Sequence, residues 1–306
     1  MIRLICLLTV FLSSLAAAKD VKLALDWFVN PDHAPIILAK QLGIFEKHNL
    51  NVDIIAPSDP SQPPKLVAAK AMDMAVSYQP QLHLQRYEGL PLSWAGTLVA
   101  TPLNCLLVVK DGPIKQLADL QGKRVGYSVS GFESAMLAQM LKHAKLSADD
   151  VEMINVNWAL SPSLMSGQVD AVIGAFRNFE LTQMRLEGVE GRCFYPEEHG
   201  VPPYDELIFV VHEQDAQAQW VQRFMAAIEE ATMVLINNPE RCWQQFIKAY
   251  PDLDDALNRQ AWKDTLPRFA LRPAAFDENR YKQFSLFLSG HGLIGQVQGS
   301  SELRGK

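Results

Sequence analysis

The chain has 306 residues, 48% hydrophobic and 20% charged, which is typical of a globular protein with one large or two medium domains. Its 28 Lys and Arg against 34 Asp and Glu give a net charge of −6, and the basic residues are scattered, which argues against nucleic acid as a partner. After the N-terminus, no apolar run approaches the roughly 18 residues of a membrane helix, so we expect a protein that is not embedded in a membrane.

Residues 1–18 are predicted to be a cleaved secretory signal peptide. Arg3 supplies the positive charge, residues 5–15 form the apolar stretch, and the alanines at 16–18 match the small-residue cleavage rule. A buried N-terminal helix is the less favoured alternative. The pattern predicts secretion through this peptide.

The rest of the chain alternates strand-like and helical stretches in two similar sets. The first has predicted strands at 21–27, 51–57, 73–78 and 91–99, and helices beginning at Pro31 and at 63–72 and 80–90. The second has predicted strands at 104–110, 123–129, 151–157 and 169–176, and helices at 131–146, 160–168 and 179–188. This order predicts mostly parallel sheets covered by helices, arranged as two α/β lobes.

A last strand is predicted at 205–211, and helical stretches follow it. Aromatic residues recur at helical spacing in these stretches, at Trp220, Phe224, Trp243, Phe246 and Trp262, and predict a packed core. We expect the chain to cross between lobes at the strands near 104–110 and 205–211. Lobe 1 would then comprise 19–105 and 207–306, and lobe 2 would comprise 106–206.

Three cysteines remain after the signal peptide, Cys105, Cys193 and Cys242, and their spacing matches no metal-binding motif. We expect them to be buried small hydrophobic residues, although one disulfide in an oxidising compartment stays open. Motifs such as GxSxG and HExxH are absent, so we expect no catalytic residues, no metal and no cofactor.

Polar and aromatic residues follow several predicted strands, where an open α/β sheet binds its ligands. The candidates are Trp27, Asn30, His33, Tyr78, Gln79, Ser130, Gly131, Asn178 and Glu180. Flat aromatic faces stack on planar rings, and amides and hydroxyls bind a ring by its edge. The mixture favours a neutral or weakly basic heterocycle over a sulfonate or phosphate, which usually draw Arg or several helix N-termini.

Structural roles compete with these ligand contacts. Trp27 could be a core aromatic, Asp32 could be the N-cap of the first helix, and His33 could pack on a neighbouring strand. Glu180 could accept N–H bonds from an aminopyrimidine or could be a first-turn carboxylate favoured by the helix dipole. The pattern alone leaves both roles of Glu180 open.

Five stretches resemble the thiamine-pyrimidine family: DWFVNPDHAPIILAKQLGIFEKHNLNVDI, DPSQPPKLVAAKAMDMAVSYQPQL, DGPIKQLADLQGKRVGYSVSGFES, SGQVDAVIGAFRNFE and EEHGVPPYDELIFV. That family contains periplasmic binding proteins for hydroxymethylpyrimidine or formylaminopyrimidine and the eukaryotic hydroxymethylpyrimidine phosphate synthases. The resemblance implies a type II periplasmic binding protein fold, in which two α/β lobes close on a ligand cleft. It also implies a periplasmic protein that delivers a thiamine-precursor pyrimidine to an ABC permease and its ATPase, for thiamine biosynthesis. The sequence indicates no oligomer, so we expect a monomer.

The resemblance favours as cleft residues Trp27, Asn30, His33, Tyr78 and Glu180, with Tyr204 and Glu206 as weaker candidates. We expect Trp27 and Tyr78 to sandwich the pyrimidine ring, while Glu180 and Asn178 bind its amino edge. More distant relatives bind sulfonates, taurine or nitrate, and a binding protein for such a solute is one alternative.

The synthases are the other alternative. In similar synthases a lysine that holds pyridoxal phosphate follows the strand matching DMAV, and a histidine lies four positions later. Ser77 and Gln81 occupy these positions here, and the stretch expected to be cysteine-rich, 202–208, reads PPYDELI. Without an amine nucleophile no Schiff base forms, so we expect a binding protein and no enzyme.

Overall fold

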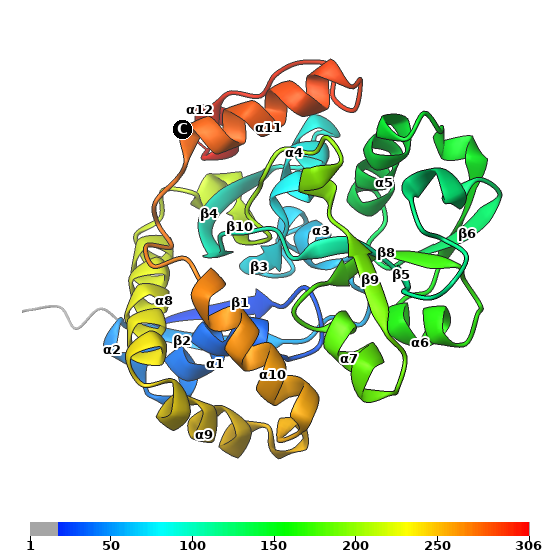
Figure 1. Cartoon of the computed structure of the whole chain (residues 1–306). Coiled ribbons are helices and arrows are strands. Elements are labelled where there is room, and N and C mark those ends of the chain that lie inside the picture. The colour runs from blue at the N-terminus through cyan, green and yellow to red at the C-terminus, as the bar shows by residue number, and fades with distance from the viewer. Residues whose placement is uncertain (1–17, 306) are drawn as a thin grey trace, which may run out of the picture.

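A computed structural model describes residues 18–305 (Figure 1). Apart from Ala18, the predicted signal peptide lies outside the described residues. Among the described helices, none combines the length and the apolar character needed to span a bilayer.

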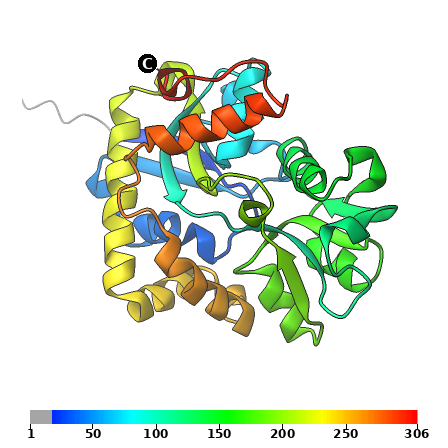
Figure 2. The same ribbon diagram turned by 45° about the horizontal axis from the view of Figure 1, so that its top comes forward.

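Two five-stranded sheets form the centres of two lobes, which lie side by side in both views of the chain (Figures 1 and 2). The first sheet has the order β2-β1-β3-β10-β4, with β1 Lys19–Ala24, β2 Leu50–Ile55, β3 Met74–Ser77, β4 Leu92–Val99 and β10 Leu207–His212. The second has the order β7-β6-β8-β5-β9, with β5 Asn104–Val109, β6 Lys123–Tyr127, β7 Val151–Asn155, β8 Ala171–Phe176 and β9 Gly191–Phe194. Short β9 is the strand that the sequence pattern did not predict.

One strand in each sheet runs against its neighbours. β10 is antiparallel to β3 and β4, and β5 is antiparallel to β8 and β9, whereas β1 and β6 pair in parallel with both of their neighbours. β5 and β10 are the first strands after each crossing between lobes, so the prediction of mostly parallel sheets fails at the strands that enter from the other lobe.

Helices cover both sheets. Their bounds are α1 Ala34–Gln41, α2 Ile44–Lys47, α3 Pro63–Ala68, α4 Gln79–Tyr87, α5 Phe132–His143, α6 Leu160–Met165, α7 Glu180–Leu186, α8 Gln219–Asn237, α9 Pro239–Ala249, α10 Ala256–Thr265, α11 Glu278–Gly290 and α12 Ser300–Leu303. A single 3-10 turn, η1 Pro31–His33, precedes α1. Helices α8 to α12 follow β10 and surround the first lobe (Figure 1). The five aromatic residues of the tail that were predicted to be core are buried there, which confirms that prediction.

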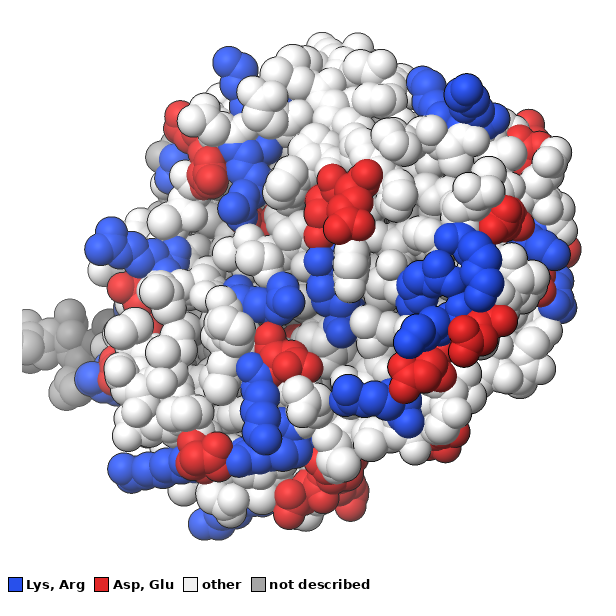
Figure 3. Space-filling model, in the orientation of Figure 1, with Lys and Arg blue, Asp and Glu red and all other residues white. Residues whose placement is uncertain are grey.

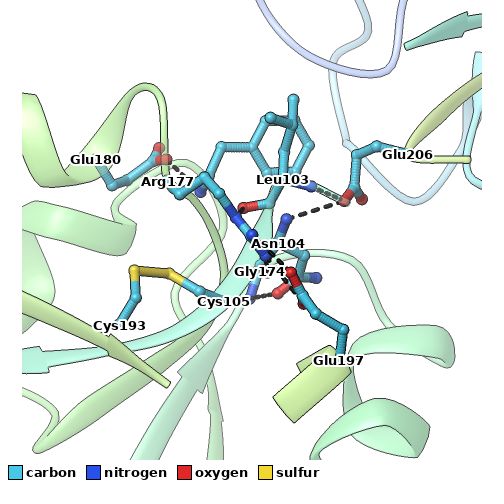
Figure 4. Close-up of a disulfide and its surroundings, with 10 residues drawn as sticks. Leu103, Asn104, Cys105, Gly174, Arg177, Glu180, Cys193, Glu197 and Glu206 are labelled. Carbon is cyan, nitrogen blue, oxygen red and sulfur yellow. Dashed lines mark hydrogen bonds and ion pairs between the residues drawn. A yellow bond between two sulfur atoms is a disulfide. The ribbon is translucent and has the colours of Figure 1, made fainter. Parts of the chain in front are cut away.

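The chain crosses between the sheets after β4 and after β9. The lobe boundary expected at 105/106 falls inside β5, whose Asn104 already pairs with Phe176 of the second sheet. The first crossing therefore precedes Asn104, and the second leads directly into β10. The Glu206 carboxylate joins the two crossings, because its Oε2 accepts hydrogen bonds from the backbone N–H groups of Leu103 and Asn104, at 2.5 and 2.9 Å (Figure 4).

Cys105 of β5 and Cys193 of β9 form a disulfide, with their Cα atoms 5.5 Å apart (Figure 4). The expectation of unpaired cysteines is therefore wrong for this pair, because adjacent strands bring together two residues that are 88 positions apart in sequence. It holds for Cys242, which is free and buried.

Candidate functional site

A cavity lies between the two lobes, beyond the ends of β1, β3, β6 and β8. The first lobe contributes Asp26, Trp27, Asn30, Asp32, His33, Tyr78 and Leu207 to its lining. The second contributes Ser128, Val129, Phe132, Glu133, Leu160, Gly174, Phe176, Phe179 and Glu180. Residues that follow strand ends in the sequence therefore meet in one cavity.

The lining is rich in carboxyl groups. Asp26, Asp32, Glu133 and Glu180 all belong to it and all are buried. No Lys or Arg among the described residues lines it. Lys and Arg lie instead on the outer surface, among Asp and Glu, on the face shown in Figure 3.

Asp26, His33 and Tyr78 form a buried hydrogen-bonded group on the first lobe. One oxygen of Asp26 lies 2.8 Å from His33 Nε2, and the other accepts a bond from the Tyr78 hydroxyl at 2.9 Å. His33 Nδ1 accepts from the Asn30 backbone N–H at 3.3 Å, so Nε2 carries the proton and donates to Asp26. Both ring nitrogens of His33 are used within the protein, and its role is to orient Asp26.

Asn30 is the N-cap of the turn before α1. Its side-chain oxygen accepts from the Asp32 N–H at 2.8 Å, so the N-cap role considered for Asp32 belongs to Asn30. Asp32 instead accepts a bond from Asn178 Nδ2 of the other lobe at 2.7 Å and one from the Thr265 hydroxyl of its own lobe at 2.6 Å. Burial raises the pKa of the Asp32 carboxyl.

Glu133 and Glu180 lie in the first turns of α5 and α7. Each accepts from backbone N–H groups of the preceding turn: Glu133 Oε2 from Ser128 and Val129, at 2.8 and 3.1 Å, and Glu180 Oε2 from Phe176, at 2.6 Å. Burial raises the pKa of both carboxyl groups to about 8, and the backbone bonds oppose this shift only in part.

Aromatic rings form the rest of the cavity wall. The Trp27 ring packs edge-on against Trp158 at 4.4 Å between centroids and stays half-buried. Tyr78 stacks on Phe132 of the other lobe, at 4.8 Å and 26°. Both rings have an aromatic partner within the protein, but Tyr78 is buried and Trp27 only half-buried, so Trp27 has more ring surface left for a ligand.

The structure brings together half of the site residues predicted from sequence. Trp27, Asn30, His33, Tyr78 and Glu180 line the cavity, whereas Gln79, Ser130, Gly131, Asn178 and Tyr204 lie outside its lining.

Those outside the lining have other contacts. Gln79 Oε1 accepts from the Asp205 N–H, Tyr204 donates to Glu206, and the Ser130 N–H donates to the Ser61 hydroxyl of the other lobe. Gly131 is exposed at the start of α5. Asn178 Nδ2 donates to Asp32 and Thr265, whereas its buried Oδ1, the atom that could accept from the amino edge of a ligand, has no hydrogen-bond partner among the described residues. The role expected for this amide therefore stays a prediction.

The sequence pattern placed Asp26 among the residues that follow the first strand, but it did not select Asp32, Glu133 and Phe179 as site residues. Glu133 lies two positions after the Ser130-Gly131 turn, in the first turn of a helix. This position is the one sequence feature that could have identified it as a site residue. The residues at this point do not fit pyridoxal phosphate, since the buried Ser77 hydroxyl offers no amine and donates to Gln81 Oε1 at 2.9 Å. Within residues 18–305, His, Cys, Asp and Glu form no group suited to hold a metal ion.

Among solved structures, the alkanesulfonate-binding protein SsuA from Xanthomonas axonopodis pv. citri, bound to MOPS, superimposes with a TM-score of 0.74 at 17% identity. The match covers 94% of this chain and 98% of that chain. A Candida albicans protein described as having the generic periplasmic binding protein fold gives a TM-score of 0.72 at 15% identity, covering 94% of each chain. These likenesses confirm the expected two-lobed fold.

Sequence relatives are closer. A Haemophilus influenzae protein whose name assigns it provisionally to thiamine biosynthesis is 54% identical over 279 residues, which cover 91% of this chain and 89% of that protein. A formylaminopyrimidine-binding protein from Halalkalibacterium halodurans is 32% identical over 246 residues, covering 79% and 70%. A 4-amino-5-hydroxymethyl-2-methylpyrimidine phosphate synthase from Legionella pneumophila is 26% identical, covering 82% and 80%. A family model described as NMT1/THI5 like matches residues 30–242, and the chain belongs to this family.

Proposed function

We propose that the protein is a periplasmic solute-binding protein that captures a thiamine-precursor aminopyrimidine, hydroxymethylpyrimidine or formylaminopyrimidine, for import by an ABC permease and its ATPase. The observation that carries the proposal is the acidic lining of the cleft, with four buried carboxyl groups and no described Lys or Arg. An aminopyrimidine offers such groups an N–H donor and a ring nitrogen that can take a proton, and bonds with charged partners are the stronger ones.

Trp27 and Glu180 are the residues that we assign to the ligand. Trp27 presents an aromatic face for stacking, at about 0.5–1.5 kcal/mol beyond its buried area. Glu180 uses one carboxyl oxygen for the Phe176 N–H, which leaves the other oxygen to accept a bond from the amino edge of the ring. Asn30, His33 and Tyr78 hold the cleft in shape, through the bonds that they make to Asp26 and to the backbone.

The proposed location rests on three features. The N-terminal pattern is that of a signal peptide, the family relatives include a binding protein, and a disulfide joins Cys105 and Cys193. Disulfides persist in oxidising compartments such as the periplasm. We propose a monomer that acts by lobe closure on its ligand.

The two alternatives meet specific obstacles in the cleft. A sulfonate or nitrate would place a negative charge in a lining that holds the carboxyl groups of Asp26, Asp32, Glu133 and Glu180 and no described Lys or Arg to offset it. A synthase that uses pyridoxal phosphate would need an amine where Ser77 stands. An absorbance band of a pyridoxal aldimine with the purified protein would support the synthase against our proposal.

Isothermal titration tests the proposal. We expect 4-amino-5-hydroxymethyl-2-methylpyrimidine or formylaminopyrimidine to bind, and taurine to give no heat. In the complex the ring nitrogen of the ligand would take the proton of Glu180 and leave a carboxylate. Glu180→Gln should therefore weaken pyrimidine binding by about 1.5–3 kcal/mol, the range for a hydrogen bond to a charged group. The matched control is Glu187→Gln, at the exposed end of the same helix, which should bind like the wild type. Binding of taurine without binding of either pyrimidine would overturn the proposal.

A further inference from the structure

We propose that Glu133 makes the cleft selective for unphosphorylated ligands, because its carboxyl group occupies the backbone N–H groups at which a phosphate or sulfonate would bind. The inference rests on the proposed function only for the identity of the ligand, a pyrimidine alcohol. The exclusion of anions stands on the geometry of the turn between β6 and α5.

The turn from β6 into α5 has the form of an anion-binding site. Its backbone N–H groups precede a helix of three turns, whose dipole adds positive potential at this end. Ser128, Val129 and Glu133 all line the cavity, so an anion that took the place of the Glu133 carboxyl group at these N–H groups would lie at the cavity wall. In this chain both N–H groups donate to the same oxygen of Glu133, at 2.8 and 3.1 Å.

The Glu133 side chain is firmly enclosed in this position. It is 2% exposed, and its carboxyl group lies directly over Gly174, where any Cβ atom would overlap with it. Gly174 has a φ of +97°, a conformation that L residues with side chains rarely adopt. A side chain at position 174 would therefore displace the Glu133 carboxyl group from this position.

The other carboxyl groups around Glu133 also disfavour an anionic ligand at this point. Glu180 lines the same cavity, and Glu206 lies close enough that both carboxyl groups raise the pKa of Glu133. Asp26 and Asp32 face the cavity from the first lobe. A phosphate ester would meet carboxyl groups on both sides and would find the N–H donors of the α5 turn already used.

The test compares one alcohol with its phosphate ester. Isothermal titration of the wild type with 4-amino-5-hydroxymethyl-2-methylpyrimidine and with its phosphate ester should show the ester binding at least 100-fold more weakly. Glu133→Ala frees the two N–H groups and should reduce this ratio at least tenfold. The same variant should gain a thermal shift with inorganic phosphate, which the wild type should lack and which needs no pyrimidine.

Glu133→Gln is the matched control. It removes the ionisable group but keeps an oxygen that accepts from Ser128 and Val129, so it should still exclude inorganic phosphate. The inference is overturned if the wild type binds ester and alcohol equally, if folded Glu133→Ala gains no phosphate binding, or if Glu133→Gln gains as much as Glu133→Ala. Wild type that binds neither pyrimidine but excludes phosphate would contradict the proposed function and leave the role of Glu133 supported.

Discussion

At the scale of single residues, hydrogen bonds within the protein decide which side chains of the cleft remain for a ligand. His33 and Asn30 line the cavity, but their polar atoms already bond to Asp26, Asp32 and the backbone. Trp27 and the second oxygen of Glu180 are less committed. The residue type at a strand end therefore predicts which residues lie near the cavity. The hydrogen bonds in the structure decide which of them can bind a ligand.

Gly174 offers a test at this scale. Gly174→Ala should destabilise the protein by about 1–3 kcal/mol through strain at its positive φ, and should also displace Glu133 and weaken ligand binding. Urea unfolding and isothermal titration measure the two effects. The control, Gly167→Ala, has a φ of +73° in open space and should cost about 1–2 kcal/mol without a change in affinity. Equal affinities of the two variants would contradict the placement of the Glu133 carboxyl over Gly174.

At the scale of elements, the same arrangement recurs at three helix starts that face the cleft. Asp32, Glu133 and Glu180 lie in the first turns before or within α1, α5 and α7. Helix N-termini usually attract anionic ligands. Here the chain places its own carboxyl groups at these helix starts.

The pairing of β5 with β9 gives a prediction for stability. Because the disulfide closes a loop across 88 positions of lobe 2, the double variant Cys105→Ala/Cys193→Ala should lower the free energy of unfolding by about 2–5 kcal/mol. Urea unfolding with and without dithiothreitol measures this loss. Reductant should destabilise the wild type and Cys242→Ala and leave the double variant unchanged. Equal free energies of unfolding of the wild type with and without dithiothreitol would show that the disulfide does not form.

At the scale of the whole molecule, side chains from both lobes bond and pack across the cleft. Asn178 bonds to Asp32 and Thr265, Ser130 bonds to Ser61, and Trp27 packs on Trp158. These contacts enclose carboxyl groups that burial penalises in their charged form. The stability of the ligand-free protein is therefore tied to their protonation.

The pH dependence of stability follows from these groups. The folded pKa is about 8 for Glu133 and Glu180 and about 7 for Glu206, because burial raises each above the ordinary 4.5. At pH 7 the unfolded chain has already released these protons, whereas the native protein still holds part of them. The native protein releases them between pH 7 and 8.5, so the free energy of unfolding falls as the pH rises through this range. Burial lowers the pKa of His83 to about 4, so the unfolded chain takes up a proton at this residue more readily than the native protein. His83 therefore lowers the free energy of unfolding as the pH falls below about 6.5.

Urea midpoints of the ligand-free protein should accordingly be lower at pH 8.5 than at pH 7. Glu133→Gln, which cannot ionise, should show a smaller difference between the two pH values. An unchanged or higher midpoint at pH 8.5 would contradict the burial of these carboxyl groups.

The sequence by itself determined the two-lobed α/β fold, the family and the neighbourhood of the cleft. Strand and helix periodicity are local properties, and strand ends of an open sheet meet at one edge, so Trp27, Tyr78 and Glu180 were predictable. The tertiary structure decided that β5 and β10 run antiparallel, that Cys105 pairs with Cys193, and that Asn178 bonds to Asp32. Each of these depends on residues far apart in the chain, whose proximity no local pattern encodes.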